Sequence, residues 1–275
     1  MDTDILQGVL NEYIKCIVDE LNSVSIVEKS FGDLALKLPT YTADGVLHRD
    51  DIEYLARTIG GFGLSTEPKL SLGFIERGID APIIFYLDKG EVHFDSSSYK
   101  YARIVVQVAV IMARADKEVD SEEVNSIDTL IWKQKGITNQ EKIFLQAKAK
   151  YLLAIDGAYD EQYRDYMKIA LNKQSTIKKM EGLSESAILG LLEVAKEVAV
   201  ADGHLDLKEL GFIQDIYRVL GVHARKAKKD IESFAKSRYI DLEKESCKTG
   251  SLFDEQIFDE IDDVVGDLLA DFDEL

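Results

Sequence analysis

The chain has 275 residues, with 46% hydrophobic content, 31% charged residues and a formal net charge of -18. The composition is ample for a globular core, and the charge argues against nucleic acid or anionic membrane as the main partner while permitting cations or basic protein surfaces. Cys16 and Cys247 stand in no metal-ligand or redox spacing, so neither a disulfide framework nor a zinc site is expected. The N-terminus lacks a basic region followed by an apolar run, and no apolar run approaches the roughly 20 residues that span a bilayer. A cytoplasmic protein is expected.

Helical periodicity and only 3 prolines predict a mostly helical class. A first helix is expected up to about residue 22, an irregular segment over residues 30–42, and a connector over residues 65–81. Two strand-like runs over residues 83–94 flank Asp88-Lys89-Gly90, which is typical of a three-residue turn. The pattern allows one small β-hairpin at residues 82–95.

The next helix, from one of the serines at 96–98 to Arg114, is apolar nearly all round, which is the signature of a helix buried by its neighbours. Further helices are predicted at about residues 139–154, 160–171 and 184–200. Residues 223–239 are basic and are typical of a solvated helix face. Residues 251–275 carry ten acids and no base beside a continuous apolar stripe. They predict an amphipathic helix that either docks on the helical block or binds a partner.

One supersecondary pattern is repeated along the chain. Ala201–Val222, which reads ADGHLDLKELGFIQDIYRVLGV, predicts a helix end, an acidic turn with Asp206 as N-cap and Glu209 as capping-box partner, and a second helix. Similar copies occupy Ala43–Leu64 and Ala115–Ile137, and a weaker copy begins at Ile155. Stacked helix–acidic turn–helix hairpins explain the repetition, because one hairpin cannot bury its apolar face alone.

The acids of the turns have two interpretations. One hairpin offers too few oxygens for a calcium site, but two facing hairpins would surround a calcium, magnesium or manganese ion. The six candidate ligands are Asp116, Asp120, Glu123, Asp202, Asp206 and Glu209. Alternatively, the acids are ordinary helix caps stabilised by the helix dipole. Capping does not require Asp116 and Asp202, which stand near the end of a preceding helix, where the dipole disfavours negative charge.

The turn Ala-Asp-Gly-x-Leu-x-x-x-Glu, followed by an aliphatic helix and Leu-Gly, resembles the tellurite-resistance TerB family and the related N-terminal segment of DjlA-type proteins. The resemblance is best at Ala201–Val222, good at Ala115–Ile137, and covers about half of the chain. It implies an all-helical domain of a bacterial cytoplasmic protein tied to metal or chemical stress or to phage defence. It also implies that the acids of the turns are metal ligands and that the protein has partner proteins at the membrane. Lys117, in place of a glycine, departs from the pattern.

These observations predict an all-α protein in three parts. Residues 1–96 form an N-terminal helical region with the first repeat copy, residues 97–240 a TerB-like domain, and residues 241–275 an acidic amphipathic helix. The expected function is a non-enzymatic module in which a divalent cation ties two hairpins together; the alternative is a structural adaptor that binds protein partners without metal. The four histidines match no catalytic or zinc spacing, and Gly60-Gly-Phe-Gly63 lacks the strand-before-helix context of a phosphate loop, so that stretch is read as a helix end.

Overall fold

A computed structural model describes residues 3–38, 49–70, 81–115, 119–154, 172–201, 204–205, 207–237 and 241–242. The predicted helical class is confirmed, since helices dominate the described residues and only two small sheets accompany them there. The helices are α1 Thr3–Leu21, α2 Phe31–Ala35, α3 Arg49–Gly61, α4 Ser97–Ala113, α5 Ser121–Lys133, α6 Asn139–Ala154, α8 Lys173–Met180, α9 Glu185–Ala199, α10 Leu207–Val219 and α11 Ala224–Ser237. None of these described helices combines the length and apolar character that crossing a membrane requires.

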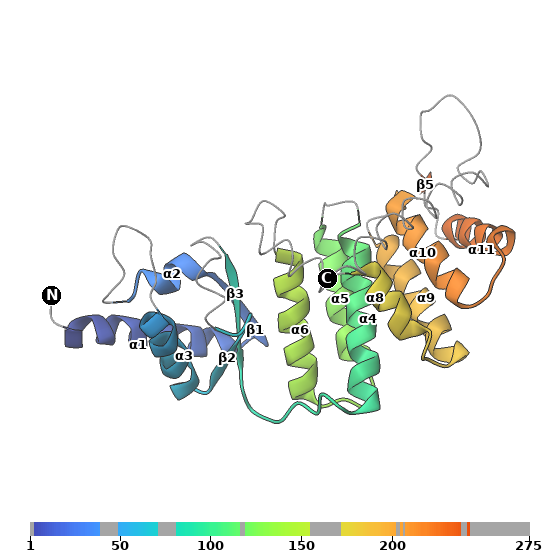
Figure 1. Ribbon diagram of the computed structural model, residues 1–275. Helices are drawn as coiled ribbons and strands as arrows, with labels where there is room; N and C mark the ends of the chain where they lie inside the picture. Colours follow the sequence, from blue (N-terminus) through green and yellow to red (C-terminus); the bar gives the residue numbers. More distant parts are fainter. Residues whose placement is uncertain are drawn as a thin grey trace, which may run out of the picture.

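Five short strands complete the fold of the described part of the chain. They are β1 Ile26–Ser30, β2 Leu64–Glu67, β3 Pro82–Leu87, β4 His204–Leu205 and β5 Asp241–Leu242. The first three form an antiparallel sheet of order β1-β3-β2, and β4 pairs with β5 in parallel. The molecule is elongated, with α1–α3 and the larger sheet at one end, α4–α6 in the middle and α8–α11 at the other end (Figure 1).

Two hydrophobic cores follow this division. The N-terminal core joins α1, α2 and α3 to the sheet, and the main core joins α4 to α11. Helix α4 lies at the centre of the main core, packed against α5, α6, α8 and α9. Its middle is buried all round, as its sequence predicts, and Ser96 caps it by accepting the Tyr99 N–H at 3.1 Å. Five of its consecutive residues, 108–112, are no more than 3% exposed.

Strand β3 serves both cores. Ile83 and Phe85 belong to the N-terminal core, whereas Ile84 and Tyr86 belong to the main core, and all four side chains are no more than 3% exposed. The alternation follows from the period of two in a β-strand, which sends successive side chains to opposite faces of the sheet. The face carrying Ile84 and Tyr86 packs on α6, as Figure 1 also shows. The two cores therefore share one strand.

The β-hairpin expected at residues 82–95 is not formed. Residues 82–87 are a strand, but its partners are β1 and β2, which come from far earlier in the chain. The segment that follows runs along the start of α6 instead: Gln140 donates its side-chain amide to the Leu87 carbonyl at 3.0 Å, and Glu141 accepts the His93 N–H at 2.9 Å. Phe94 packs edge-on against Phe144 at 5.6 Å between ring centroids. These side-chain contacts replace the second strand of the predicted hairpin.

Other expectations for the N-terminal third also change. Residues 30–42 were expected to be irregular, but Ser30 ends β1 and caps α2 through its hydroxyl and the Asp33 N–H. The connector expected at residues 65–81 begins inside β2. The sequence did not predict helix α8, because this segment has few apolar residues and therefore little helical periodicity. The helix predicted at residues 160–171 and the acidic helix at 251–275 lie outside the described residues.

Glu141 supports a first prediction. This carboxylate is 2% exposed and accepts the N–H groups of His93 and Thr138, at 2.9 and 2.7 Å. Burial raises its pKa, but the hydrogen bonds from Thr138 and His93 outweigh burial, so its net pKa lies below the ordinary value. Glu141→Gln removes the charge and one acceptor, and we expect a loss of about 1.5–3 kcal/mol in the free energy of unfolding at neutral pH.

The pH dependence of that loss has a definite sign. A depressed folded-state pKa contributes stability that is present above the unfolded-state pKa and is lost as pH falls through the folded-state value. The difference between wild type and Glu141→Gln should therefore shrink in acid, as measured by urea unfolding at neutral pH and at about pH 3. Glu91→Gln, which changes an exposed carboxylate of the segment between β3 and α4, is the control and should have little effect. A pH-independent difference would contradict the role of the charge.

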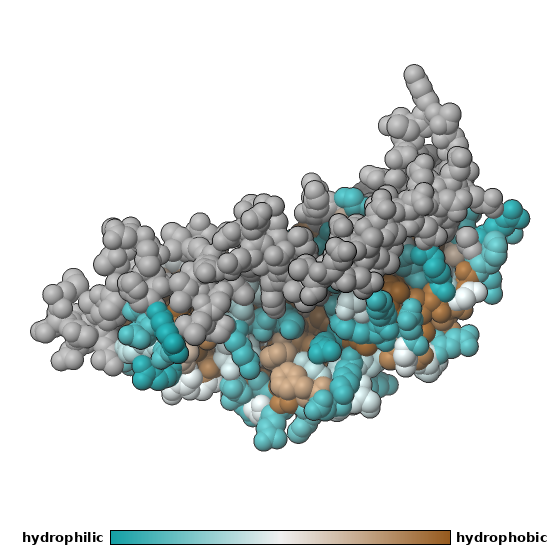
Figure 2. All heavy atoms as spheres, in the orientation of Figure 1, coloured by the Kyte–Doolittle hydropathy of each residue, from teal (hydrophilic) through white to brown (hydrophobic). Residues whose placement is uncertain are grey.

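Polar residues surround the hydrophobic ones on the face drawn in Figure 2, where brown and teal side chains are interspersed over the middle and right-hand elements. The large hydrophobic side chains that are exposed come from separate elements, among them Leu36 at 65%, Phe94 at 49% and Trp132 at 40%. Scattered exposure of this kind is ordinary for a folded surface and does not by itself mark a docking face among the described residues.

Candidate functional site: the acidic turns

The first acidic turn leads from α4 into α5. Asp120 is the N-cap of α5 with an extended backbone, φ -86° and ψ 158°. Glu123 returns to it, its Oε2 accepting the Asp120 N–H at 3.0 Å, in the capping-box arrangement predicted from the spacing. Glu123 is only 6% exposed, whereas Asp120 is exposed. One carboxylate of this turn is thus buried and oriented by the backbone.

The second acidic turn leads from α9 into α10 and repeats this placement. Glu209 lies in the first turn of α10 and is also 6% exposed. It stands 86 residues after Glu123, the same offset that separates Asp206 from Asp120 and Asp202 from Asp116. Two equivalent helix starts therefore carry equivalent buried glutamates.

The helices that lead into the turns lie together. Among the described helices, α4 and α9 form the most extensive helix–helix contact. Figure 1 shows that they run in the same direction and end at the same, upper end of the molecule. Their last residues, Ala113 and Ala199, are almost fully buried, at 0% and 1% exposed. The described ends of both helices thus bring the two turns to one end of the fold.

Three of the six predicted ligands, Asp116, Asp202 and Asp206, lie outside the described residues. The other three are Asp120, the N-cap of α5, and Glu123 and Glu209 in the first turns of α5 and α10. Within the described ranges, no three His, Cys, Asp or Glu side chains are grouped closely enough to hold a metal ion. The six-carboxylate site stays a prediction.

Sequence reasoning missed Arg114, which follows the end of α4. Its guanidinium donates to the carbonyls of Leu152 and Leu153, at 2.9 and 3.2 Å. Those carbonyls belong to the last turn of α6, where helix carbonyls lack intrahelical partners. Arg114 therefore ties the end of α6 to the beginning of the first acidic turn. The available signal was a single basic residue directly after a long apolar run.

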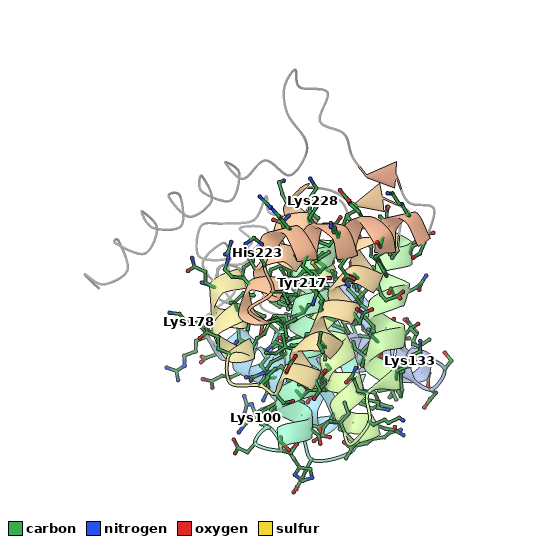
Figure 3. The ribbon with its side chains drawn as sticks, turned by 90° about the vertical axis from the view of Figure 1, so that its right-hand side faces the viewer. Lys100, Lys133, Lys178, Tyr217, His223 and Lys228 are labelled. Atoms are coloured by element: carbon green, nitrogen blue, oxygen red, sulfur yellow. The ribbon has the colours of Figure 1, made fainter. Side chains whose placement is uncertain are left out.

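A second missed group lies one helical turn before the end of α9. The Lys196 ammonium, on a residue 4% exposed, lies 2.6 Å from Oδ2 of Asp230 and 3.3 Å from Oε1 of Glu193. Tyr217 donates its hydroxyl to the same Asp230 oxygen. The ammonium also lies 5.3 Å and 5.6 Å from the ring centroids of Tyr217 and Phe234. This cluster joins α9, α10 and α11, and Figure 3 shows Tyr217 beneath α11 with Lys228 on the outer side of that helix.

The protonation states of this cluster are mutually supporting. Burial lowers the pKa of Lys196, but its hydrogen bonds with Asp230 and Tyr217 outweigh burial and hold the pKa above the ordinary value. The hydrogen bonds from Lys196 and Tyr217 hold the pKa of Asp230 below its usual range. Burial, with Asp230, raises the pKa of Tyr217 to about 12. An ammonium, a carboxylate and a neutral phenol are therefore the stable forms at neutral pH.

The fold and the turns define a class of protein: a mostly helical domain in which two helix–acidic turn–helix hairpins pack side by side. Residues 102–229, from the first turns of α4 to the middle of α11, match the family model of the tellurite resistance protein TerB. This part of the chain, just under half of it, is therefore similar to TerB, as its acidic turns suggested, and is termed the TerB-like domain. Searches of curated proteins and of solved structures gave no significant match.

Proposed function

We propose that the chain is a non-enzymatic metal-binding and interaction module of the tellurite-resistance type. It acts in the cytoplasm of a bacterium, in a metal or chemical stress response or in phage defence, through protein partners that include partners at the membrane. The match of residues 102–229 to TerB supports the family, which is generally non-enzymatic. The observation that carries the proposal is the pair of equivalent buried glutamates, Glu123 and Glu209, on neighbouring hairpins.

A divalent cation explains the placement of the acids. Each turn adds to its glutamate two aspartates, Asp116 and Asp120 in one turn and Asp202 and Asp206 in the other. Hard cations such as calcium, magnesium and manganese favour carboxylate oxygens and take more of them than one turn offers. An ion held between the turns would neutralise both sets and tie α5 to α10, which shifts the domain toward one binding-competent arrangement.

Thermal melts of the metal-stripped protein with millimolar calcium, magnesium, manganese or zinc test the proposal. We expect one of the hard cations to raise the melting temperature, because a ligand specific for the folded state stabilises it by about 2.7 kcal/mol at 100 times its dissociation constant. The rise should disappear in the double variant Asp116→Ala, Asp202→Ala. The double variant Asp19→Ala, Glu91→Ala removes the same charge from exposed positions outside the turns and should keep it.

A structural adaptor without metal is the second candidate, and one observation favours it. Glu123 already has a backbone partner in the Asp120 N–H, as a helix cap requires, with no ion needed. In that case no cation raises the melting temperature, and a partner binds equally well in the presence of a chelator. Either result would make the acidic turns structural and would remove the metal from the proposed function.

A further inference from the structure

Three positively charged side chains from three different helices lie together beside α4. They are Arg103 on α4, Lys148 on α6 and Lys179 on α8, and α4 packs against both of the other helices. Figure 3 shows that α4 and α8 present lysines on the same side of the molecule, since Lys100 near the start of α4 and Lys178 on α8 both lie toward the left-hand edge of the view. Helices far apart in the sequence therefore contribute to one positively charged surface.

Lys179 is held against α4 by a side-chain contact. Its ammonium donates to Oε1 of Gln107 at 3.2 Å, across the contact between α8 and α4. Gln107 comes one helical turn after Arg103 and lies on the same side of α4, because residues four apart in a helix share a face. Burial lowers the pKa of Lys179, and the positive charges of Arg103 and Lys148 lower it further. Both cations are therefore close enough to repel the Lys179 ammonium.

This positive charge is not balanced by ion pairs with the described residues. In that part of the chain, none of Arg103, Lys148 and Lys179 takes part in a salt bridge. Lys100 differs, although it precedes Arg103 by one turn of α4, because its ammonium lies 3.5 Å from Oδ1 of Asp95. The chain as a whole has a net charge of -18. A concentration of positive charge at one place therefore runs against the overall balance.

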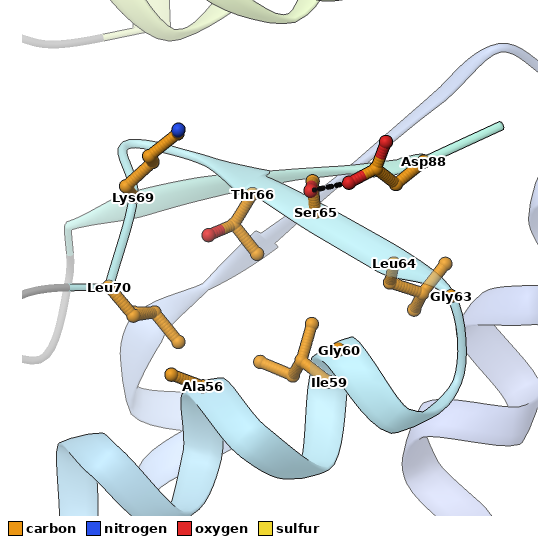
Figure 4. A pocket seen from close by; sticks show the side chains of 10 residues that line it. All are labelled: Ala56, Ile59, Gly60, Gly63, Leu64, Ser65, Thr66, Lys69, Leu70 and Asp88. Carbon is orange, nitrogen blue, oxygen red and sulfur yellow. Dashed lines mark hydrogen bonds between the residues drawn. The ribbon is translucent and has the colours of Figure 1, made fainter. Parts of the chain in front are cut away.

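The three cations are accessible to a ligand. Arg103 and Lys179 are exposed and Lys148 is half-buried. Like charges held together cost stability, and such groups are frequent at functional sites, where a bound ligand removes the repulsion. The hollow between α3 and β2, which is drawn in Figure 4, is less suited to an anion, because its lining combines one cation, Lys69, with one carboxylate, Asp88.

We propose that Arg103, Lys148 and Lys179 bind the phosphate group of a phosphomonoester. Such a group has three terminal oxygens and close to two negative charges at neutral pH, so it can accept hydrogen bonds from donors on three helices. The planar Arg103 guanidinium suits two of these oxygens at once, and the two ammonium groups act as point charges beside it. A carboxylate has one charge and would leave more of the repulsion in place.

The proposed phosphate site is separate from the acidic turns. Arg103 precedes Ala113, the last residue of α4, by ten positions, which is about 15 Å along the helix. Phosphate binding to these three side chains requires no metal ion. The site can therefore be tested with a chelator present, and its failure is distinguishable from a failure of the proposed cation site.

Calorimetric titration of the full-length chain with glucose 6-phosphate and with inorganic phosphate, in chelator and at constant ionic strength, tests the proposal. We expect saturable binding, with the affinity lowered about tenfold or more by each of Arg103→Gln, Lys148→Gln and Lys179→Gln. Lys179→Gln also removes repulsion, so its melting temperature without ligand should be unchanged or higher, which separates loss of the ligand from loss of the fold. Lys133→Gln, which changes an exposed lysine on the opposite side of the view in Figure 3, is the matched control and should bind like the wild type.

Vesicles distinguish a soluble phosphomonoester from a lipid headgroup. Phosphatidylcholine vesicles are compared with vesicles that also contain phosphatidic acid, whose headgroup is a phosphomonoester. Binding to the phosphatidic acid vesicles alone, weakened by the three variants and not by Lys133→Gln, would support the site and assign it to a lipid. Binding of neither the soluble phosphates nor the vesicles would overturn the proposal, as would binding that the three variants leave unchanged or that Lys133→Gln weakens equally.

Discussion

Replacing Phe85 by alanine is expected to cost about 3–5 kcal/mol in the free energy of unfolding, and replacing Ile84 about 2–5 kcal/mol. Both side chains are fully buried, at 0% exposed, and neither position can collapse easily because β3 is the central strand of its sheet. The two substitutions destabilise different parts of the molecule, since Phe85 belongs to the N-terminal core and Ile84 to the main core.

Amide hydrogen exchange distinguishes the two losses. Phe85→Ala should lower protection first in α1 and α3, and Ile84→Ala should lower it first in α4 and α6. Lys89→Ala, an exposed position just after the strand, is the control and should leave both patterns unchanged. Equal loss of protection in both cores from each variant would mean that β3 does not separate them and that the protein unfolds as one unit.

The second large effect is expected at Lys196. Breaking a fully buried ion pair costs about 3–5 kcal/mol. The Asp230 side chain is 52% exposed, so solvent screening reduces our expectation for Lys196→Ala to about 2–3 kcal/mol, measured by urea unfolding. Lys196→Met keeps most of the packing against Tyr217 and Phe234 and should cost less. Lys226→Ala removes an exposed lysine of α11 and should cost little.

The pH dependence of the unfolding free energy distinguishes the contribution of the Lys196 charge from that of its packing. Asp230 has a lowered folded-state pKa, so its contribution is present above the unfolded-state value and is lost as pH falls through the lowered one. Lys196 has a raised folded-state pKa, so its contribution is present below the unfolded-state value and is lost as pH rises through the raised one. The difference between wild type and Lys196→Met should be constant around neutrality and should decline at both extremes. A constant difference at all pH values would assign the effect to packing alone.

The helices were predictable because their signals are local. The all-round apolar run of α4 and its serine cap, and the capped start of α5, are visible within single stretches of sequence. The three-stranded sheet was not predictable in the same way. Asp88-Lys89-Gly90 is a fair turn signal, yet β3 pairs Phe85 with Val27 and Thr66. Tertiary pairing overrode a local preference.

The same contrast between local signals and long-range contacts holds for the candidate site. The capping role of Glu123 followed from a spacing of three residues, and the structure confirms it. Lys196 looked like an ordinary polar residue of an amphipathic helix, because its partner Asp230 lies 34 residues away on another helix. Contacts between distant elements could therefore not be predicted from the sequence alone.

The shared strand also bears on how this protein is divided for experiments. The TerB match begins at residue 102, but Ile84 and Tyr86 fill the main core from outside it. A recombinant fragment that begins at α4 would lose both side chains and uncover Phe144 on α6, whose ring meets Tyr86 edge-on at 6.2 Å between centroids. A fragment that retains β3 would bring with it two unpaired strand edges, which invite aggregation. Expression of the TerB-like domain in a soluble form should therefore succeed best when the polypeptide begins before β1.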